Sequence, residues 1–134
     1  TQNRRVLMAA HHKKIENILK LETQARYDYF IRKVADFEVV WGLFDNGWAT
    51  AESGKITAVP FWPEEDFATL CASAEWKGFT AKSIELDDFL MRWLPGMQGD
   101  GRICQVFSTP DEQGFLVPPE DLLGAIKQEV EQYE

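Results

Sequence analysis

The spacing of hydrophobic residues predicts that the chain begins with helices. Apolar side chains recur at helical spacing in residues 12–21, and residues 23–37 carry them in the i, i+3, i+4, i+7 pattern of a helix with one buried stripe. Thr23 stands where an N-cap of the second helix is expected. The predicted stripe consists of Tyr27, Phe30, Ile31, Val34 and Phe37. The chain therefore starts with two helices or with one kinked helix.

After residue 37 the helical period gives way to short runs rich in β-branched and aromatic residues. Three strands are predicted, at residues 38–44, 48–51 and 55–61. They are separated by Asp45-Asn46-Gly47 and by Glu52-Ser53-Gly54, whose residue types suit the positive φ angles of hairpin turns. This pattern predicts a three-stranded antiparallel meander.

Acidic residues gather at three predicted helix starts. Carboxylates are favourable in the first turn of a helix because the helix dipole is positive there, and prolines such as Pro63 suit the first helical position. The acids are Glu64, Glu65 and Asp66 in the first group, Glu85, Asp87 and Asp88 in the second, and Glu120 and Asp121 in the third. This repetition favours a structural explanation of the carboxylates over a chemical one.

Helices and strands alternate in the second half of the chain. Pro95-Gly96 is expected to end the second of these helices. The predicted helices are one that begins at Pro63 and includes Phe67, Leu70 and Cys71, and two at residues 85–94 and 118–133. The predicted strands are residues 79–84, 102–109 and 115–117. The order of elements predicts an α+β fold with a mainly antiparallel sheet. We expect residues 12–134 to form a single compact domain and residues 1–11 to form a basic N-terminal arm that can be mobile.

The balance of charge limits the partners that the chain can have. Residues 1–20 hold five Lys or Arg and one Glu, whereas the remaining residues hold nine Lys or Arg and twenty-one Asp or Glu. An acidic body repels phosphate backbones, so nucleic acid is not the expected partner. An anion-binding role of residues 1–20 remains a minor hypothesis. No run of apolar residues has the length of a membrane span, and no signal-peptide pattern is present, so the expected location is the cytoplasm.

Several reaction classes lack the residues that they need. The two histidines, His11 and His12, are adjacent near the N-terminus, which leaves no histidine to activate a serine or cysteine inside the predicted domain. Cys71 and Cys104 are far apart, have apolar neighbours and form no metal-binding motif, so they are expected to be reduced core residues. We expect no metal site, no cofactor and no catalytic residue. The chain is more in keeping with a protein that is not an enzyme.

A set of tryptophan and proline landmarks resembles one small family. These landmarks are Val40-Trp41-x-Leu43, Gly47-Trp48, Pro60-Phe61-Trp62-Pro63 with Phe67-Ala68, Leu86 to Leu90 followed by Trp93 to Gly96, and Val106-Phe107-x-x-Pro110. In this order they resemble the "domain of unknown function 2750" family over about residues 15–125. The resemblance implies a bacterial, cytosolic, single-domain protein. It carries no established activity and no catalytic residue.

The leading hypothesis is a non-enzymatic binding module that recognises another protein, with a toxin-neutralising or regulatory role as its refinement. Tryptophan is a favoured interface anchor, and an acidic surface steers basic partners. The alternative is a small-ligand-binding protein or a carboxylate-based enzyme with a pocket near Trp62 and Glu64. A homodimer stays open without being indicated. The candidate binding residues are Trp48, Phe61, Trp62, Glu64, Glu65 and Asp88.

Overall fold

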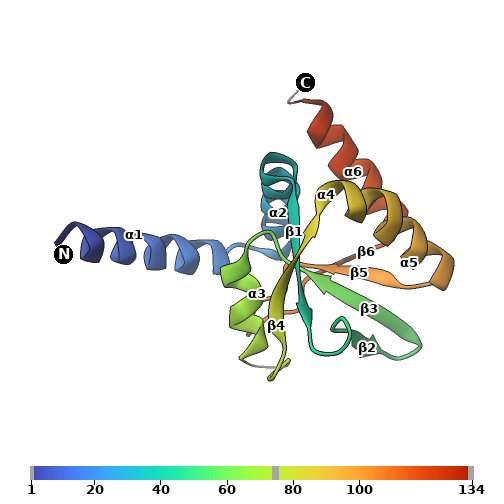
Figure 1. The fold of residues 1–134 in the computed structure, drawn as a ribbon, viewed down its shortest axis with the longest axis horizontal. Coiled ribbons are helices and arrows are strands. Elements are labelled where there is room, and N and C mark those ends of the chain that lie inside the picture. Colours follow the sequence, from blue (N-terminus) through green and yellow to red (C-terminus); the bar gives the residue numbers. More distant parts are fainter. Residues whose placement is uncertain (1, 74–75, 133–134) are drawn as a thin grey trace.

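Two helices open the chain. The computed structural model describes residues 2–73 and 76–132, so Thr1 and the predicted helix end at Tyr133 lie outside the described residues. Helix α1 (Gln2–Leu19) extends away from the rest of the molecule, whereas α2 (Thr23–Phe37) is part of the packed body (Figure 1). The first helix starts ten residues earlier than predicted, because no glycine or proline interrupts residues 2–19. Most of the basic arm is therefore helical.

The end and the start of α2 differ from the prediction in detail. Phe37 is exposed instead of completing the buried stripe, since the chain leaves the helix directly after it through Glu38 in the left-handed conformation. The N-cap is Glu22, and Thr23 is the first helical residue. Arg26, which the sequence analysis did not single out, lies on the buried side of this helix.

The strands form two sheets. Strands β1 (Val39–Phe44) and β4 (Thr80–Glu85) form an antiparallel pair. A second sheet has the order β2-β3-β5-β6, with β2 at Ala51–Ser53, β3 at Ile56–Phe61, β5 at Ile103–Val106 and β6 at Phe115–Val117. Only the β3–β5 pair among these is parallel. The predicted α+β fold with mainly antiparallel pairing is confirmed.

The meander predicted from three consecutive strands is realised only in part. Asn46 and Gly54 adopt positive φ in the two predicted turns, and the second strand pairs with β3. However, this strand occupies Ala51–Ser53 and not the predicted residues 48–51, because the chain becomes extended only after Thr50 and the hairpin turn is shorter than expected. Strand β1 forms its ladder with β4, and among the described residues it is bridged to the segments expected beside it at Phe44↔Trp48 and Trp41↔Trp62. Turn residues identify where the chain reverses, whereas the partner of β1 is chosen by packing with a strand that is distant in the sequence.

Helices begin at the three places where clusters of acidic residues predicted them. Helices α3 (Glu65–Ala72), α4 (Leu86–Asp88) and α6 (Pro119–Glu131) each carry two acids in their first turn. Pro119 occupies the first position of α6, whereas Pro63 lies before the N-cap of α3, which is Glu64. The acids therefore have the structural role expected from the helix dipole.

Pro95-Gly96 does not end a helix, contrary to the prediction. Residues Phe89–Trp93 form a π-helical turn in which the Leu94 N–H donates to Phe89 O, and α5 (Leu94–Asp100) continues from it with Pro95 in its first turn. The wider turn accommodates a residue that has no N–H to donate and whose ring crowds the preceding turn. The helix ends instead at Gly101, which has a φ of 72°.

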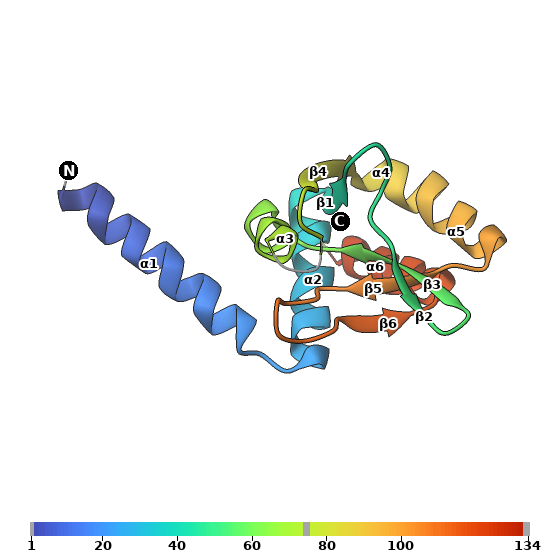
Figure 2. The ribbon, with the colours of Figure 1, turned by 90° about the horizontal axis from the view of Figure 1, so that it is seen from below.

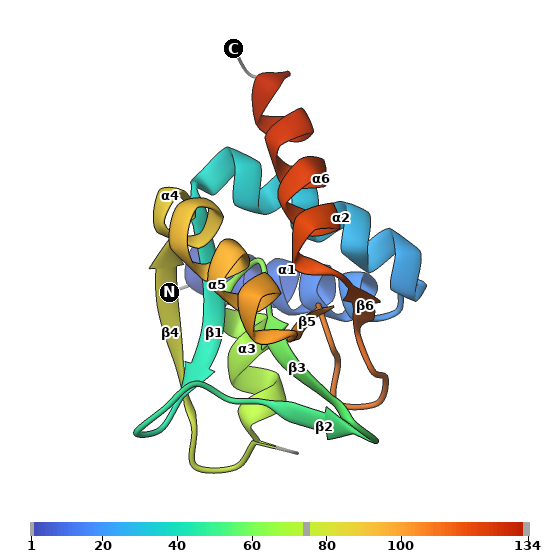
Figure 3. The ribbon, with the colours of Figure 1, turned by 90° about the vertical axis from the view of Figure 1, so that its right-hand side faces the viewer.

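Three helices cover one face of the four-stranded sheet. Helices α2, α5 and α6 lie together on this side (Figures 2 and 3). Val59, Phe61, Cys104 and Val106 alternate along β3 and β5 and are buried in the core. The opposite face carries the small side chain of Ala58 and the amide of Gln105. Among residues 2–73 and 76–132, no helix has an apolar stretch that could cross a membrane.

Candidate functional site

Phe61 and Trp62 are core residues, so the prediction that they line a groove is wrong. Both side chains have a relative exposure of 0%. The Trp62 indole donates from Nε1 to Ser108 O at 2.9 Å, and its ring meets Trp76 edge-on, whereas Phe61 packs against Phe89. Phe61 is the last residue of β3, and Trp62 after it bridges to Trp41 of β1. The two prolines beside Trp62 therefore do not expose it.

Trp48 and Asp88 lie at another place, beside the π-helical turn. Both line a shallow cavity of about 340 Å³, together with Trp93 and Arg92. The Trp48 ring is half-buried and packs so closely on β1 that a Cβ at Gly42 would lie 3.0 Å from it. Asp88 is paired with Arg92 one helical turn later, at 3.4 Å. The structure thus brings two predicted residues together, and the carboxylate among them is already paired.

Glu64 and Glu65 begin α3 and do not share a described cavity with Asp88. Glu64 Oε2 accepts a 2.6 Å hydrogen bond from the Tyr29 hydroxyl, and its other oxygen lies 3.9 Å from Lys14 Nζ. Burial and the bond to Glu64 raise the pKa of Tyr29, because both favour the protonated hydroxyl. The next acid of this turn, Asp66, meets His11 Nε2 at 2.9 Å. These carboxylates tie α1 and α2 to the start of α3.

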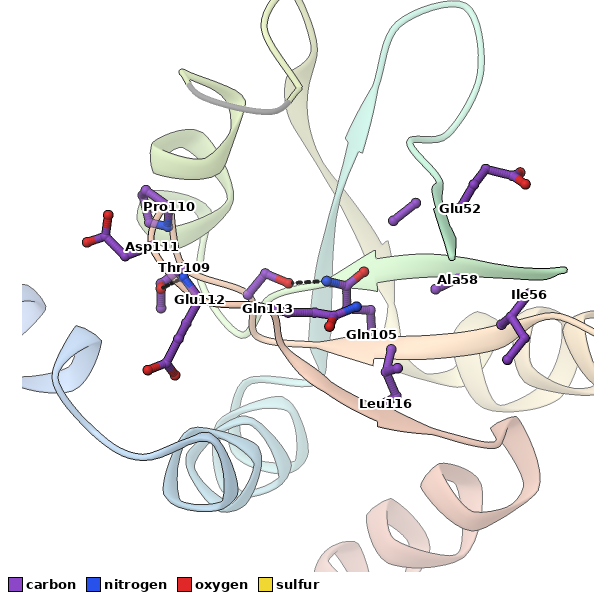
Figure 4. A pocket seen from close by; sticks show the side chains of 12 residues that line it. Glu52, Ile56, Ala58, Gln105, Thr109, Pro110, Asp111, Glu112, Gln113 and Leu116 are labelled. Carbon is purple, nitrogen blue, oxygen red and sulfur yellow. Dashed lines mark hydrogen bonds between the residues drawn. The ribbon is translucent and has the colours of Figure 1, made fainter. Parts of the chain in front are cut away.

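A deeper candidate lies over the four-stranded sheet. We call it the sheet cavity, and it has a volume of about 340 Å³. Figure 4 shows loop residues 109–113 on one side of it and Glu52 and Ile56 on the other, with Gln105 between them. The lining residues are Ala51, Glu52, Ile56, Ala58, Gln105, Ser108, Thr109, Pro110, Asp111, Glu112, Gln113 and Leu116.

The floor of the sheet cavity holds a buried amide with one unused polar atom. Gln105 has a relative exposure of 3%, and its Nε2 donates to Ser108 Oγ at 2.7 Å. The Gly114 N–H donates to the same hydroxyl at 2.9 Å. Gln105 Oε1 has no hydrogen-bond partner among the described residues. Because a buried carbonyl normally has a partner, this oxygen marks the floor as a place where a donor is missing.

The loop beside the cavity is held from beneath by Arg26. This guanidinium has a relative exposure of 1% and donates to Phe107 O at 3.1 Å and to Leu21 O at 2.6 Å. It also forms a 3.0 Å ion pair with Glu112. Phe107 itself has a φ of 60°, which is uncommon for a residue with a bulky side chain. A buried cation thus holds the loop that forms one wall of the cavity.

The family of the chain follows from a match over most of its length. Residues 27–126 match the model of the family described as "Protein of unknown function (DUF2750)". The chain belongs to the DUF2750 family. The resemblance seen in the tryptophan and proline landmarks is thereby confirmed. A search of curated proteins finds no match to this DUF2750 member.

The sequence of this DUF2750 member contains one signal for the sheet cavity. Gln105 is an uncharged polar residue in the middle of the apolar strand Ile103–Val106. A polar side chain at such a position needs a buried partner. The partner could not be predicted, since the shape of the loop brings Ser108 to Gln105, with the Gly114 N–H donating to the same Ser108 hydroxyl.

Substituting Gly114 is expected to disturb the cavity. A Cβ at this position would lie 2.5 Å from Val106 O and 2.8 Å from Ser108 N, and neither backbone atom can move aside without moving β5 or the loop. We expect Gly114→Ala to lower the free energy of unfolding by about 1–3 kcal/mol.

Gly124→Ala is the matched control because nothing lies within 4 Å of its added methyl group. Since Gly124 lies inside α6, this control should stabilise by up to about 1 kcal/mol in urea denaturation. Equal effects of the two substitutions would contradict the close backbone approach.

The two thiols of this DUF2750 member are core groups. Cys71 and Cys104 are buried and form no disulfide, and the Cys71 thiol donates to Ser108 O at 3.2 Å. Burial, with a smaller contribution from Glu120, raises the pKa of Cys104 to about 12. The described residues contain no group of three or more His, Cys, Asp or Glu side chains placed to hold a metal ion.

Alkaline solution is expected to destabilise the fold. Cys104 and Tyr29 both have raised pKa values in the folded state, so each stabilises the fold fully below its ordinary pKa and loses that contribution as the pH rises toward the folded value. The unfolding free energy should fall above about pH 9, with a limiting slope of ~1.4 kcal/mol per pH unit for each group. Urea denaturation between about pH 8 and about pH 11 measures this slope. Cys104→Ala should make it shallower, and an unchanged slope would show that this thiol does not contribute.

Proposed function

We propose that this protein is a non-enzymatic binding module that recognises another protein through the sheet cavity. The observation that carries the proposal is the unpartnered oxygen of Gln105 on the cavity floor. A buried acceptor without a donor costs about 1–3 kcal/mol of stability. A ligand that supplies an N–H at this point would recover that cost on binding.

The rim of the cavity has the character of a protein interface. The apolar side chains of Ile56 and Leu116 are 47% and 40% exposed and flank the polar floor. Exposed aliphatic groups around a polar centre suit a partner that covers them on binding. Glu52, Asp111 and Glu112 add negative charge to the rim.

The charge of the whole chain favours a basic partner. Its formal net charge is −8, and long-range attraction of this kind raises association rates. The form of this function that we propose is a regulatory or toxin-neutralising role in the bacterial cytoplasm. The alternative pocket near Trp62 and Glu64 loses its motivation, because Trp62 lies entirely in the core.

A peptide-display selection tests the proposal. Random peptides are selected on the wild-type chain after counter-selection on Gln105→Met, which removes the acceptor while nearly preserving side-chain volume. We expect peptides whose affinity falls by about tenfold or more in Gln105→Met, the loss typical of one hydrogen bond to a charged group. A selection that yields only peptides bound equally by both chains would contradict recognition at the sheet cavity.

The stability of Gln105→Met is a prediction of its own. The substitution removes one hydrogen bond to Ser108 and also removes the unpaired carbonyl oxygen, and these effects oppose each other. We therefore expect the urea midpoint to stay the same or to rise. If the free energy of unfolding fell by more than about 2 kcal/mol, the native Gln105 side chain would be stabilising the fold. It would then not be an unpaired group that destabilises it.

A further inference from the structure

We infer that the group received by the sheet cavity is the guanidinium of an arginine side chain in the partner protein. This inference rests on the proposed function and names the chemistry of the bound segment. It starts from the atoms that the cavity presents to a ligand and from the charges around them.

The floor of the cavity holds a buried hydrogen-bond acceptor, and carboxylates are among the residues of its rim. Gln105 Oε1 needs a donor. Of the rim acids, Glu52 accepts from the Thr57 hydroxyl and Glu112 pairs with Arg26, whereas Asp111 has no hydrogen bond or ion pair to another described residue. No Lys, Arg or His belongs to the described lining. A ligand group with several N–H donors and a positive charge complements this arrangement, and an anionic group is disfavoured.

The walls distinguish a guanidinium from an ammonium group. The apolar part of the lining consists of Ala51, Ile56, Ala58, Pro110 and Leu116. An ammonium group is a strongly hydrated point charge and loses much hydration beside such walls. A guanidinium is more weakly hydrated, and its several N–H groups can donate to an amide oxygen beside apolar walls. Gln105 supplies this oxygen, whereas the rim acids attract the ligand through their charge, since Figure 4 shows the Asp111 carboxylate at the far side of the cavity and directed away from Gln105.

The loop that carries Asp111 is fixed from its other side, which keeps the cavity ready for a ligand. Arg26 binds Phe107 O and Glu112, while the Trp62 indole and the Cys71 thiol both donate to Ser108 O. These bonds anchor the loop at both of its ends. A preorganised site loses less conformational entropy when it binds.

The test is a titration of the full chain, labelled with ¹⁵N, with single-residue probes. The probes are N-acetyl-arginine amide, the matched uncharged N-acetyl-citrulline amide, N-acetyl-lysine amide and N-acetyl-glutamate amide. The side-chain amide signal of Gln105 is identified by its disappearance in Gln105→Met. We expect the arginine probe to shift this signal in a saturable way and citrulline to bind about tenfold more weakly, as loss of a charge-assisted hydrogen bond predicts.

A rim variant provides a second readout that does not depend on the buried amide. Glu52→Gln with Asp111→Asn changes exposed groups only, and it should weaken arginine binding several-fold and reduce its dependence on salt. Equal binding of arginine and citrulline, stronger binding of lysine, or no shift with any probe would overturn the inference. Preferred binding of the glutamate probe would also overturn it, because Gln105 would then present its N–H₂ group to the ligand.

These outcomes are distinguishable from failure of the proposed function. Selected peptides that depend on Gln105 but contain no arginine would uphold protein recognition and overturn the guanidinium. The opposite result is an arginine probe that binds at Gln105 while no selected peptide depends on this residue. It would uphold the guanidinium chemistry and contradict the proposal that the guanidinium belongs to a partner protein.

Discussion

Arg26→Met is expected to destabilise the fold by about 3–5 kcal/mol, the loss typical when one member of a buried charged network is removed. The guanidinium is almost fully buried and satisfies the carbonyls of Leu21 and Phe107 while pairing with Glu112. Methionine retains much of the apolar stem but offers no N–H to these carbonyls. Both segments that Arg26 joins should become more mobile in the variant. These are the loop that forms one wall of the sheet cavity and the connection between α1 and α2.

The matched control for this prediction is Arg92→Met. Arg92 is 84% exposed and pairs with Asp88 one helical turn away, so its loss should change stability by less than about 1 kcal/mol. Urea denaturation of both variants gives the comparison. Similar unfolding free energies for the two would contradict the assignment of Arg26 as the anchor of the loop.

Trp62→Ala should have an effect of the same size, about 3–5 kcal/mol, which is usual for removing a large aromatic side chain from a core. Trp62 fills the interior beside Trp76, and its indole N–H satisfies Ser108 O. Ser108 also supplies the hydroxyl that holds Gln105, so the variant should disturb the cavity floor as well. Hydrogen exchange of the Gly114 amide, which donates to that hydroxyl, reports this disturbance directly.

Trp48→Ala is the comparison that separates a core tryptophan from a partly exposed one. Trp48 is half-buried against Gly42, Phe44 and Trp93. Its loss should cost clearly less than the loss of Trp62, and the hydrogen exchange of Gly114 should not change. If Trp62→Ala were the milder of the two, the placement of Trp62 in the core would be wrong.

Local patterns predicted the elements of this fold well. The apolar stripe of residues 23–37 identified α2, and acids in the first turn identified α3, α4 and α6. Asn46 and Gly54 marked real turns. Each of these signals depends on interactions within a few residues, which a sequence contains directly.

Features that depend on distant contacts were not predictable in this way. The pairing of β1 with β4 joins residues about forty positions apart, such as Val40 and Ile84. Trp62 was expected to be partly exposed because prolines flank it, yet Pro60 lies within β3 and Trp62 bridges to Trp41 in the interior. The surroundings of the Gln105 amide depend on the loop of residues 107–114, and Arg26 in α2 holds that loop in position. Neither can be inferred from residues close to Gln105 in the sequence.

Isothermal titration of one selected peptide with the wild-type chain and with Gln105→Met tests the central claim most directly. If the unpaired oxygen of Gln105 accepts a partner's N–H, the affinity of the peptide for the variant should be lower by about tenfold or more. The urea midpoint of the variant should equal or exceed that of the wild type. Undiminished affinity in a stably folded Gln105→Met would show that the sheet cavity is not the recognition site.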